Sequence, residues 1–165
     1  MSAPALELAV VDPRLPEAAE LIRVLSEELA QRYDYVDDGS GDFKPEDALV
    51  PRSAFVLGWV AGRAVACGAF RPLEGDVAEI KRMFVLPECR GLGYSKAVLT
   101  ELERLALEQG YTTARLETGV RQPEAIGLYE WAGYTRIPNF GIYVDSEESV
   151  CFEKYLLNTP ERASL

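Results

Sequence analysis

The sequence predicts a single α/β domain, built on a mixed, mostly antiparallel sheet of six to seven strands with helices on both faces. Three observations predict it. The length of 165 residues suits one domain, and the 48% of hydrophobic and 27% of charged residues suit one buried core. Runs rich in β-branched and aromatic residues are also interrupted by segments with helical periodicity. We expect residues 1–157 to form the domain and residues 158–165 a flexible tail.

A strand and an amphipathic helix open the chain. Residues 5–11 are apolar and end at Asp12-Pro13, which suits a short strand. Apolar residues then recur at the three- and four-residue spacing of one helix face: Ala18, Leu21, Ile22, Leu25, Leu29 and Tyr33. Residues 34–51 are rich in Asp, Gly, Ser and Pro, and they predict a long surface loop with or without one helical turn.

Three strands should follow as an antiparallel meander. Residues 54–60 and 63–71 are separated by Ala61-Gly62, where the glycine supplies the positive φ that a tight hairpin needs. A second turn leads into a strand at residues 77–85. Strict alternation would place on one face of this strand Ala78, Ile80, Arg82 and Phe84, and on the other Glu79, Lys81, Met83 and Val85.

Helices and strands alternate in the second half of the chain. Residues 94–109 predict a helix with one apolar stripe, and Gly110 is placed to end it in a left-handed cap. The later elements are a strand at 112–118, a short helix at 123–131, and closing strands at 134–137 and 150–156. A strand, helix and strand between residues 80 and 118 imply a right-handed parallel crossover, so the sheet should be mixed.

The composition excludes several classes of function. The 17 basic and 27 acidic residues leave a formal charge of −10, which disfavours nucleic acid as a partner. Histidine is absent, so catalytic triads and zinc helices that need it are excluded. Cys67, Cys89 and Cys151 lack metal-ligand spacing, and we expect no metal. Because no apolar run approaches the roughly 20 residues of a membrane span, we expect a cytoplasmic protein without a membrane partner.

One segment, residues 85–96, is suited to binding an anion. Gly91 and Gly93 permit close backbone approach, and the helix that follows directs unpaired N–H groups at its first turn. Four basic residues between positions 81 and 96 oppose one acidic residue, which gives 4 − 1 = +3: Lys81, Arg82, Arg90 and Lys96 against Glu88. An ordinary turn with solvated charges is the alternative. A Rossmann fingerprint is excluded because Lys96 occupies the third glycine position, and no P-loop string is present.

The segment Arg90-Gly-Leu-Gly-Tyr-Ser95 resembles the [RQ]-x-x-G-x-[GA] motif of the GNAT superfamily of N-acetyltransferases, which use acetyl-coenzyme A (acetyl-CoA). It matches at Arg90 and Gly93, and Ser95 replaces the usual Gly or Ala. Residues 124–134 resemble the family's A-x-x-L-Y-x-x-x-G-[FY] block, and residues 149–156 resemble its closing strand. The resemblance is close from residue 79 to residue 156 and only architectural before that.

The resemblance implies a GNAT-like fold and an acetyl-CoA site, with acetyl-CoA as cosubstrate. It assigns the pantetheine arm to the strand at 77–85, along Met83, Phe84 and Val85. It assigns the diphosphate to Arg90, Gly91, Gly93, Tyr94, Ser95 and Lys96, although Lys96 is equally suited to a solvated surface. Gln122 stands where many members place an asparagine that contacts the cofactor.

The resemblance also implies the catalytic residues. Tyr129 lies where the family places a tyrosine that protonates the departing thiolate; a packing role is the alternative. Glu79 is the expected base that takes the proton of the attacking amine, or else a solvent-facing or salt-bridged glutamate on a strand. Without histidine, neither Cys67 nor Cys89 has an activating base, so direct attack in a ternary complex is expected rather than an acetyl-cysteine.

The expected activity is therefore acetyl transfer to a primary amine on a small molecule or peptide, with longer acyl donors left open. An acidic stretch at residues 33–47 would attract such an amine or would simply be solvated: Asp34, Asp37, Asp38, Asp42, Glu46 and Asp47. The alternative is a catalytically silent domain that binds acetyl-CoA as a sensor or interaction module. The family is also compatible with a homodimer.

Overall fold

The computed structural model of the protein describes residues 4–34 and 43–158. Its strands are β1 (Glu7–Val10), β2 (Ala54–Val60), β3 (Arg63–Glu74), β4 (Val77–Val85), β5 (Thr113–Gly119), β6 (Thr135–Ile137) and β7 (Ser149–Tyr155). Its helices are α1 (Pro16–Arg32), α2 (Tyr94–Glu108) and α3 (Pro123–Trp131), with 3-10 turns η1 (Pro45–Ala48), η2 (Pro87–Cys89), η3 (Gly141–Tyr143) and η4 (Leu156–Asn158). These bounds differ from the predicted ones by a few residues. The loop predicted at 34–51 contains one helical turn, η1, which the sequence analysis had left open.

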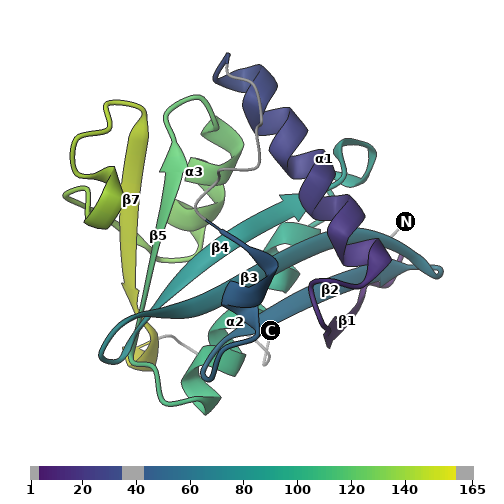
Figure 1. Cartoon of the computed structure of the whole chain (residues 1–165), viewed down its shortest axis with the longest axis horizontal. Helices are drawn as coiled ribbons and strands as arrows, with labels where there is room; N and C mark the ends of the chain where they lie inside the picture. Colours follow the sequence, from purple (N-terminus) through teal and green to yellow (C-terminus); the bar gives the residue numbers. More distant parts are fainter. Residues whose placement is uncertain (1–3, 35–42, 159–165) are drawn as a thin grey trace.

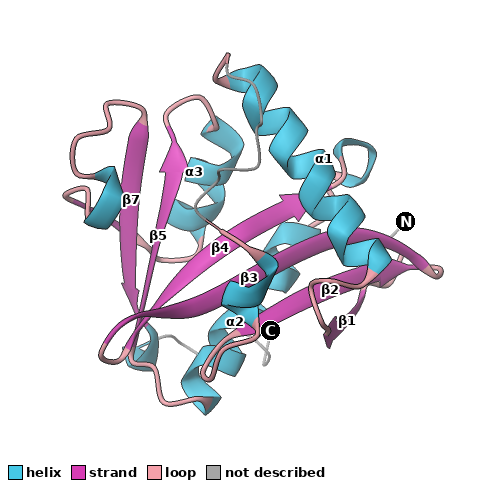
Figure 2. Cartoon of the chain, in the orientation of Figure 1, coloured by secondary structure: helices cyan, strands magenta, loops and turns pink. Residues whose placement is uncertain are grey.

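The strands form one sheet in the order β1-β2-β3-β4-β5-β7-β6 (Figures 1 and 2). All neighbours pair antiparallel except β4 and β5, which are parallel and joined through α2. Gly110 adopts φ +91° after α2, as expected of a glycine that ends a helix. The predicted fold class, a mixed and mostly antiparallel sheet with helices, is confirmed.

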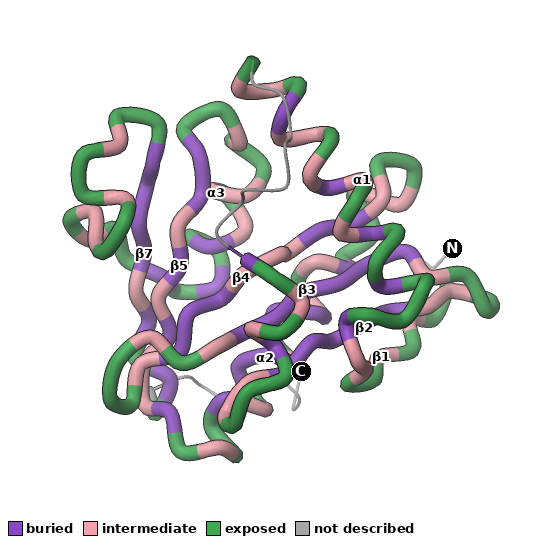
Figure 3. The backbone as a smooth tube through the Cα atoms, viewed as in Figure 1, coloured by how far each residue is buried: buried purple, intermediate pink, exposed green. Residues whose placement is uncertain are grey.

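The two faces of the sheet carry separate cores. On one face, α1 packs Leu21 and Leu25 against Phe55, Leu57 and other side chains of β2 to β4. On the other face, α2 and α3 pack against the sheet through a larger cluster that includes Val98, Leu102, Tyr129, Ile80 and Leu116. Figure 3 shows the buried residues running along the central strands. No helix within the described ranges is long and apolar enough to cross a membrane.

The strict alternation predicted for β4 is wrong after Lys81. The pairing of β3 with β4 shifts between Cys67↔Phe84 and Ala69↔Lys81, so Arg82 and Met83 together face Gly68. Arg82 adopts φ +59° in this bulge. A bulge sets two residues against one on the partner strand. The extra residue therefore changes the phase of the strand, which means that the side chains after it point to the opposite faces of the sheet from those that strict alternation predicts.

The change of phase is visible in the two cores. Ile80 belongs to the core under α2, whereas Phe84 belongs to the core under α1, and Met83 and Val85 lie on the α2 side. Gly68 makes room for this arrangement, since a Cβ there would stand 2.7 Å from the Met83 sulfur.

Strands β4 and β5 separate halfway along their length. They pair from Val77↔Thr113 to Ile80↔Leu116, yet β4 continues to Val85 and β5 to Gly119. Figure 1 shows the two strands diverging from this point, and we call the divergence the fork between β4 and β5. Beyond Ile80, the edge of β4 that faces β5 is therefore not paired with that strand, in the middle of the sheet.

Candidate active site

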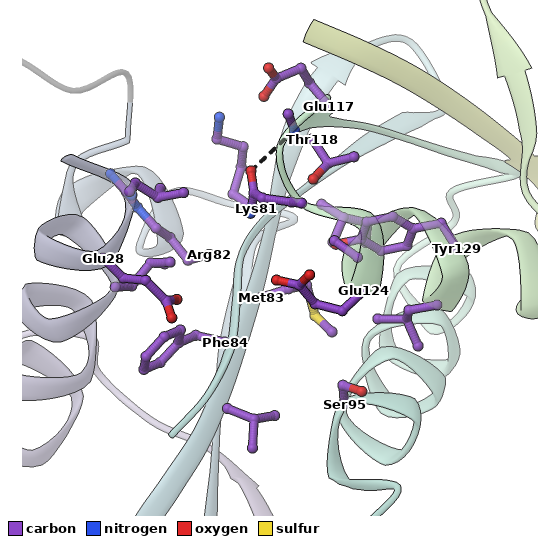
Figure 4. A pocket seen from close by; sticks show the side chains of 18 of the residues that line it. Glu28, Lys81, Arg82, Met83, Phe84, Ser95, Glu117, Thr118, Glu124 and Tyr129 are labelled. Carbon is purple, nitrogen blue, oxygen red and sulfur yellow. Dashed lines mark hydrogen bonds between the residues drawn. The ribbon is translucent and has the colours of Figure 1, made fainter. Parts of the chain in front are cut away.

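A cleft of about 460 Å³ occupies the fork between β4 and β5 (Figure 4). Its walls come from the end of β4, the turn before α2, the end of β5, and the facing sides of α1 and α3. Most of the predicted site residues line it: Met83, Phe84, Val85, Arg90, Gly91, Gly93, Tyr94, Ser95, Gln122 and Tyr129. Glu79 and Lys96 do not.

The turn before α2 has the geometry of an anion-binding site. Gly91 and Gly93 adopt φ +80° and +86°, a conformation that favours glycine. A Cβ on either residue would meet no protein atom within 4 Å, so the space above the turn is open. Gly93 is the N-cap of α2, and no side chain of the described residues caps this helix end. Its first amide groups are therefore suited to phosphate oxygens.

Arg90 is held in place beside this turn. Its Nε donates to the carbonyl oxygen of Val85 at 2.9 Å, and its Nη2 forms an ion pair with Glu28 of α1 at 2.9 Å. The guanidinium also lies over the Phe84 ring, 5.4 Å from the ring centre. Lys96 points elsewhere, with its Nζ 4.4 Å from the centre of the Trp131 ring.

Tyr129 lies on α3 with 5% of its surface exposed. Its ring packs against Tyr134 and Phe152, with ring centres 5.8 and 6.1 Å away. Burial, and secondarily the charge of Glu117, raise the pKa of Tyr129 above its ordinary value. None of the hydrogen bonds between described residues uses its hydroxyl group. The phenol thus stays protonated at neutral pH and borders the cleft.

Glu79 lies away from the cleft. It is 3% exposed, and its Oε1 accepts a hydrogen bond from Nε of Arg71 at 2.9 Å. Arg71 also pairs with Asp47 at 2.8 Å. The structure therefore does not bring Glu79 together with Tyr129, and it shows the salt-bridged glutamate that the sequence left as an alternative.

Glu117 is one of the carboxylates that line the cleft, and the sequence analysis did not single it out. It lies near the end of β5, and its Oε2 accepts a hydrogen bond from Ser149 Oγ at 2.6 Å. The sequence held a signal for it. Where two strands run parallel, ligands bind at the carboxyl ends of the strands, and residue 117 lies near the carboxyl end of the predicted strand at 112–118.

Gln122 joins α1 to the β5–α3 turn. Its Oε1 accepts hydrogen bonds from the Gly119 amide at 3.1 Å and from the Tyr33 hydroxyl at 3.2 Å. Next to it, Arg32 of α1 forms an ion pair with Glu124 of α3. These contacts connect the end of α1 with the β5–α3 turn and with α3.

The predicted acidic stretch is only partly described. Asp34 pairs with Arg121 at 3.3 Å and Asp47 with Arg71, so both carry a structural ion pair. Asp37, Asp38 and Asp42 lie outside the described residues. Attraction of the acceptor by this stretch stays a prediction.

Comparison with known proteins gives a consistent result. Residues 18–134 match the model of the acetyltransferase (GNAT) family. An "IAA acetyltransferase" of Azospirillum brasilense is 32% identical over 142 residues, covering 80% of this chain and 93% of that protein. An uncharacterized N-acetyltransferase of Escherichia coli, YjgM, is 32% identical over 128 residues, covering 74% of this chain and 77% of that protein.

Solved structures share the fold. A GNAT-family acetyltransferase from Staphylococcus aureus superposes with a TM-score of 0.76 at 18% identity, over 92% of this chain and 99% of that one. A GNAT acetyltransferase from Elizabethkingia anophelis, solved with acetyl-CoA bound, gives a TM-score of 0.66 at 14% identity, over 91% and 97%. The family resemblance predicted from the motifs is confirmed: the chain belongs to the GNAT family of acetyltransferases and is an acyltransferase.

Proposed function

We propose that the protein moves an acetyl group from acetyl-CoA to a primary amine by direct attack in a ternary complex. One observation carries the proposal: a single cleft joins the anion-binding turn, the part of the β4 edge that β5 leaves unpaired, and the buried Tyr129. The acetyl-CoA in the E. anophelis relative, which shares the fold, supports the same donor.

The residues present fit the coenzyme. Open space above Gly91 and Gly93 suits a diphosphate, which the α2 amides and Arg90 would bind. The backbone of β4 beyond Ile80 is suited to the amides of the pantetheine arm, which would bind like an added strand. Acetyl-CoA supplies the acetyl group as a thioester.

Tyr129 would hold the proton that the departing sulfur needs. A free alkyl thiol has a pKa of about 8.5, close to that of a cysteine side chain. The pKa of Tyr129 lies above the ordinary tyrosine value, so its hydroxyl group keeps its proton until negative charge develops on the sulfur. Its missing hydrogen-bond partner among the described residues supports this role, as does its place on the cleft wall.

Glu117 would take the proton of the amine, directly or through a water molecule. It lines the same cleft as Tyr129 and is close enough to raise the pKa of that residue. Glu79, the base expected from the sequence, is the second candidate, although its ion pair with Arg71 holds it outside the cleft. Comparing Glu117→Gln with Glu79→Gln separates the two: a large loss of kcat/KM should follow only the first.

Direct attack is favoured over an acetyl-cysteine intermediate. Cys89 lines the cleft, but the sequence has no histidine that could activate its thiol. Burial raises the pKa of Cys67 to about 12, so this thiol is not a nucleophile at neutral pH. Cys151 is also buried, and burial raises its pKa.

The proposed activity is tested by measuring coenzyme A release from acetyl-CoA across a panel of amines and peptides, with mass spectrometry of the products. Release that depends on the amine, together with an acetylated product, is the expected result. Calorimetric binding of acetyl-CoA without release for any acceptor would instead indicate the silent sensor. An acetylated cysteine on the trapped enzyme would overturn the direct mechanism.

A further inference from the structure

An ion pair lies buried between α2 and β7, away from the cleft. Glu103 of α2 and Lys154 of β7 are 6% and 7% exposed, and the lysine Nζ donates to Glu103 Oε1 at 2.9 Å. The other carboxylate oxygen, Oε2, accepts a hydrogen bond from the Tyr134 hydroxyl at 2.9 Å. None of these three is among the described residues that line the cleft. One buried carboxylate thus joins β7 to the turn that follows α3.

Stability alone does not explain this ion pair. Removing two charges from water costs free energy, so a buried pair is often no more stabilising than apolar residues of the same volume. Its hydrogen bonds do fix positions, because their strength depends on distance and direction. Lys154 adds a further contact, with its Nζ 5.6 Å from the centre of the Tyr134 ring. The pair therefore holds Tyr134 through both its hydroxyl group and its ring.

Tyr134 is in turn a neighbour of Tyr129. The two rings meet edge to face, with centres 5.8 Å apart and planes inclined at 63°. The Tyr134 amide also donates to the carbonyl oxygen of Tyr129 at 3.0 Å. Phe152, whose ring centre is 6.1 Å from that of Tyr129, lies two residues before Lys154 and so on the same face of β7. Both rings that pack against Tyr129 thus belong to the surroundings of the ion pair.

The orientation of Tyr129 depends on these ring contacts. Its hydroxyl group takes part in none of the hydrogen bonds between described residues, so within that part of the chain packing sets its direction. A proton donor must be placed accurately, since a displacement of about 1 Å can lower a rate about 10²-fold. A fixed Tyr134 ring therefore keeps the Tyr129 side chain in a defined position on the cleft wall.

We propose that Glu103 and Lys154 are positioning residues for acetyl transfer. They hold the Tyr134 ring, and this ring keeps the hydroxyl group of Tyr129 within reach of the departing sulfur. The inference rests on the proposed role of Tyr129. It adds to that role a set of residues that act from behind the tyrosine, without lining the cleft themselves.

Tyr134→Phe tests the proposal, since it keeps the ring and removes the hydroxyl group that Glu103 holds. We expect kcat, measured by coenzyme A release, to fall about tenfold. The KM and the calorimetric Kd of acetyl-CoA should stay within about twofold of the wild-type values, because the variant leaves the residues that line the cleft in place.

Tyr111→Phe is the matched control. Tyr111 is 1% exposed, its hydroxyl group donates to the carbonyl oxygen of Arg52 at 2.6 Å, and its ring meets Phe70 edge to face. Both variants thus remove one hydrogen bond from a buried tyrosine, and both should lower the free energy of unfolding measured in urea. Only Tyr134→Phe should lower kcat.

A double-mutant cycle separates positioning from a general structural defect. In the Tyr129→Phe background, Tyr134→Phe should lower kcat by less than about twofold, since no hydroxyl group is left to position. The paired substitution of Glu103→Leu with Lys154→Met removes both charges with little change in volume, so the fold should remain stable. In the wild-type background this pair should lower kcat about as much as Tyr134→Phe does.

The outcomes separate this inference from the proposed function. Wild-type kcat in Tyr134→Phe or in the paired variant would overturn the inference and leave acetyl transfer intact. So would an equal loss of kcat in Tyr111→Phe, or a loss that persists in the Tyr129→Phe background. Wild-type kcat in Tyr129→Phe itself would remove the proposed role of Tyr129 and this inference with it. Absence of coenzyme A release from every amine would overturn the proposed function as well.

Discussion

The two ends of the cleft are built from different parts of the chain. The end that we propose for the coenzyme, the coenzyme end, is made mainly of backbone: the glycine turn, the first amides of α2 and the edge of β4. The other end, which we propose for the acceptor and call the acceptor end, is made of side chains, with Lys81 from β4 and Glu117 from β5. Backbone can bind the same ligand group with many sequences, whereas side chains select among ligands. Within one fold, the donor can therefore stay constant while the acceptor varies.

The largest expected effect is on kcat and comes from Tyr129, which lies between the two ends of the cleft. Tyr129→Phe should lower kcat by about 10²–10⁴-fold, because it removes the proton donor for the leaving sulfur. The affinity for acetyl-CoA measured by calorimetry should change little, since the ring still packs against Tyr134 and Phe152. An unchanged kcat would assign Tyr129 to packing alone.

A second substitution disturbs the bulge on which the acceptor end depends. Gly68→Ala places a methyl group within 3 Å of Met83, Leu102 and Val98, and the core must shift. Overpacking of this kind costs about 1–3 kcal/mol, so urea unfolding should show a loss of that size. The KM of the acceptor should rise more than that of acetyl-CoA. Full stability with unchanged kinetics would mean that the bulge is not needed.

The coenzyme end offers a direct contrast between backbone and side chain. Gly93→Ala forces alanine into φ +86°, which costs about 1–2 kcal/mol, and puts a methyl group where the ligand binds. The Kd for coenzyme A should therefore rise about tenfold or more. The matched variant Ser95→Ala keeps the backbone and should change the Kd by less than about threefold. Equal losses in both variants would show that side chains hold the diphosphate.

The smallest expected effect is on the pH dependence of kcat, which should show no fall from loss of the Tyr129 proton. Burial and the charge of Glu117 raise the pKa of Tyr129, so the phenol keeps its proton as the pH rises toward 10. The kcat of the wild-type protein should therefore not fall between pH 7 and pH 9.5 through loss of this proton. A fall with a midpoint near pH 8.5 that is absent in Tyr129→Phe would contradict the raised pKa.

The difference between the two ends also explains what could be predicted from the sequence. The elements follow from periodicity, and the glycine turn lies in one continuous segment around Gly91 and Gly93, so both could be predicted. The bulge at Arg82 depends on Gly68 and on the packing of α2, which no local pattern records. The ion pair of Glu79 with Arg71 is a contact between strands, so only tertiary structure reveals it and the place of Glu117 on the cleft.

The division of the cleft is tested most directly by hydrogen–deuterium exchange with and without acetyl-CoA. Added acetyl-CoA should slow exchange of the amides between residues 81 and 96, in wild type and in Lys81→Met alike, and much less in Gly93→Ala. No slowing in that segment of the wild-type protein, or a loss of slowing in Lys81→Met as large as in Gly93→Ala, would contradict a coenzyme held by backbone and an acceptor held by side chains.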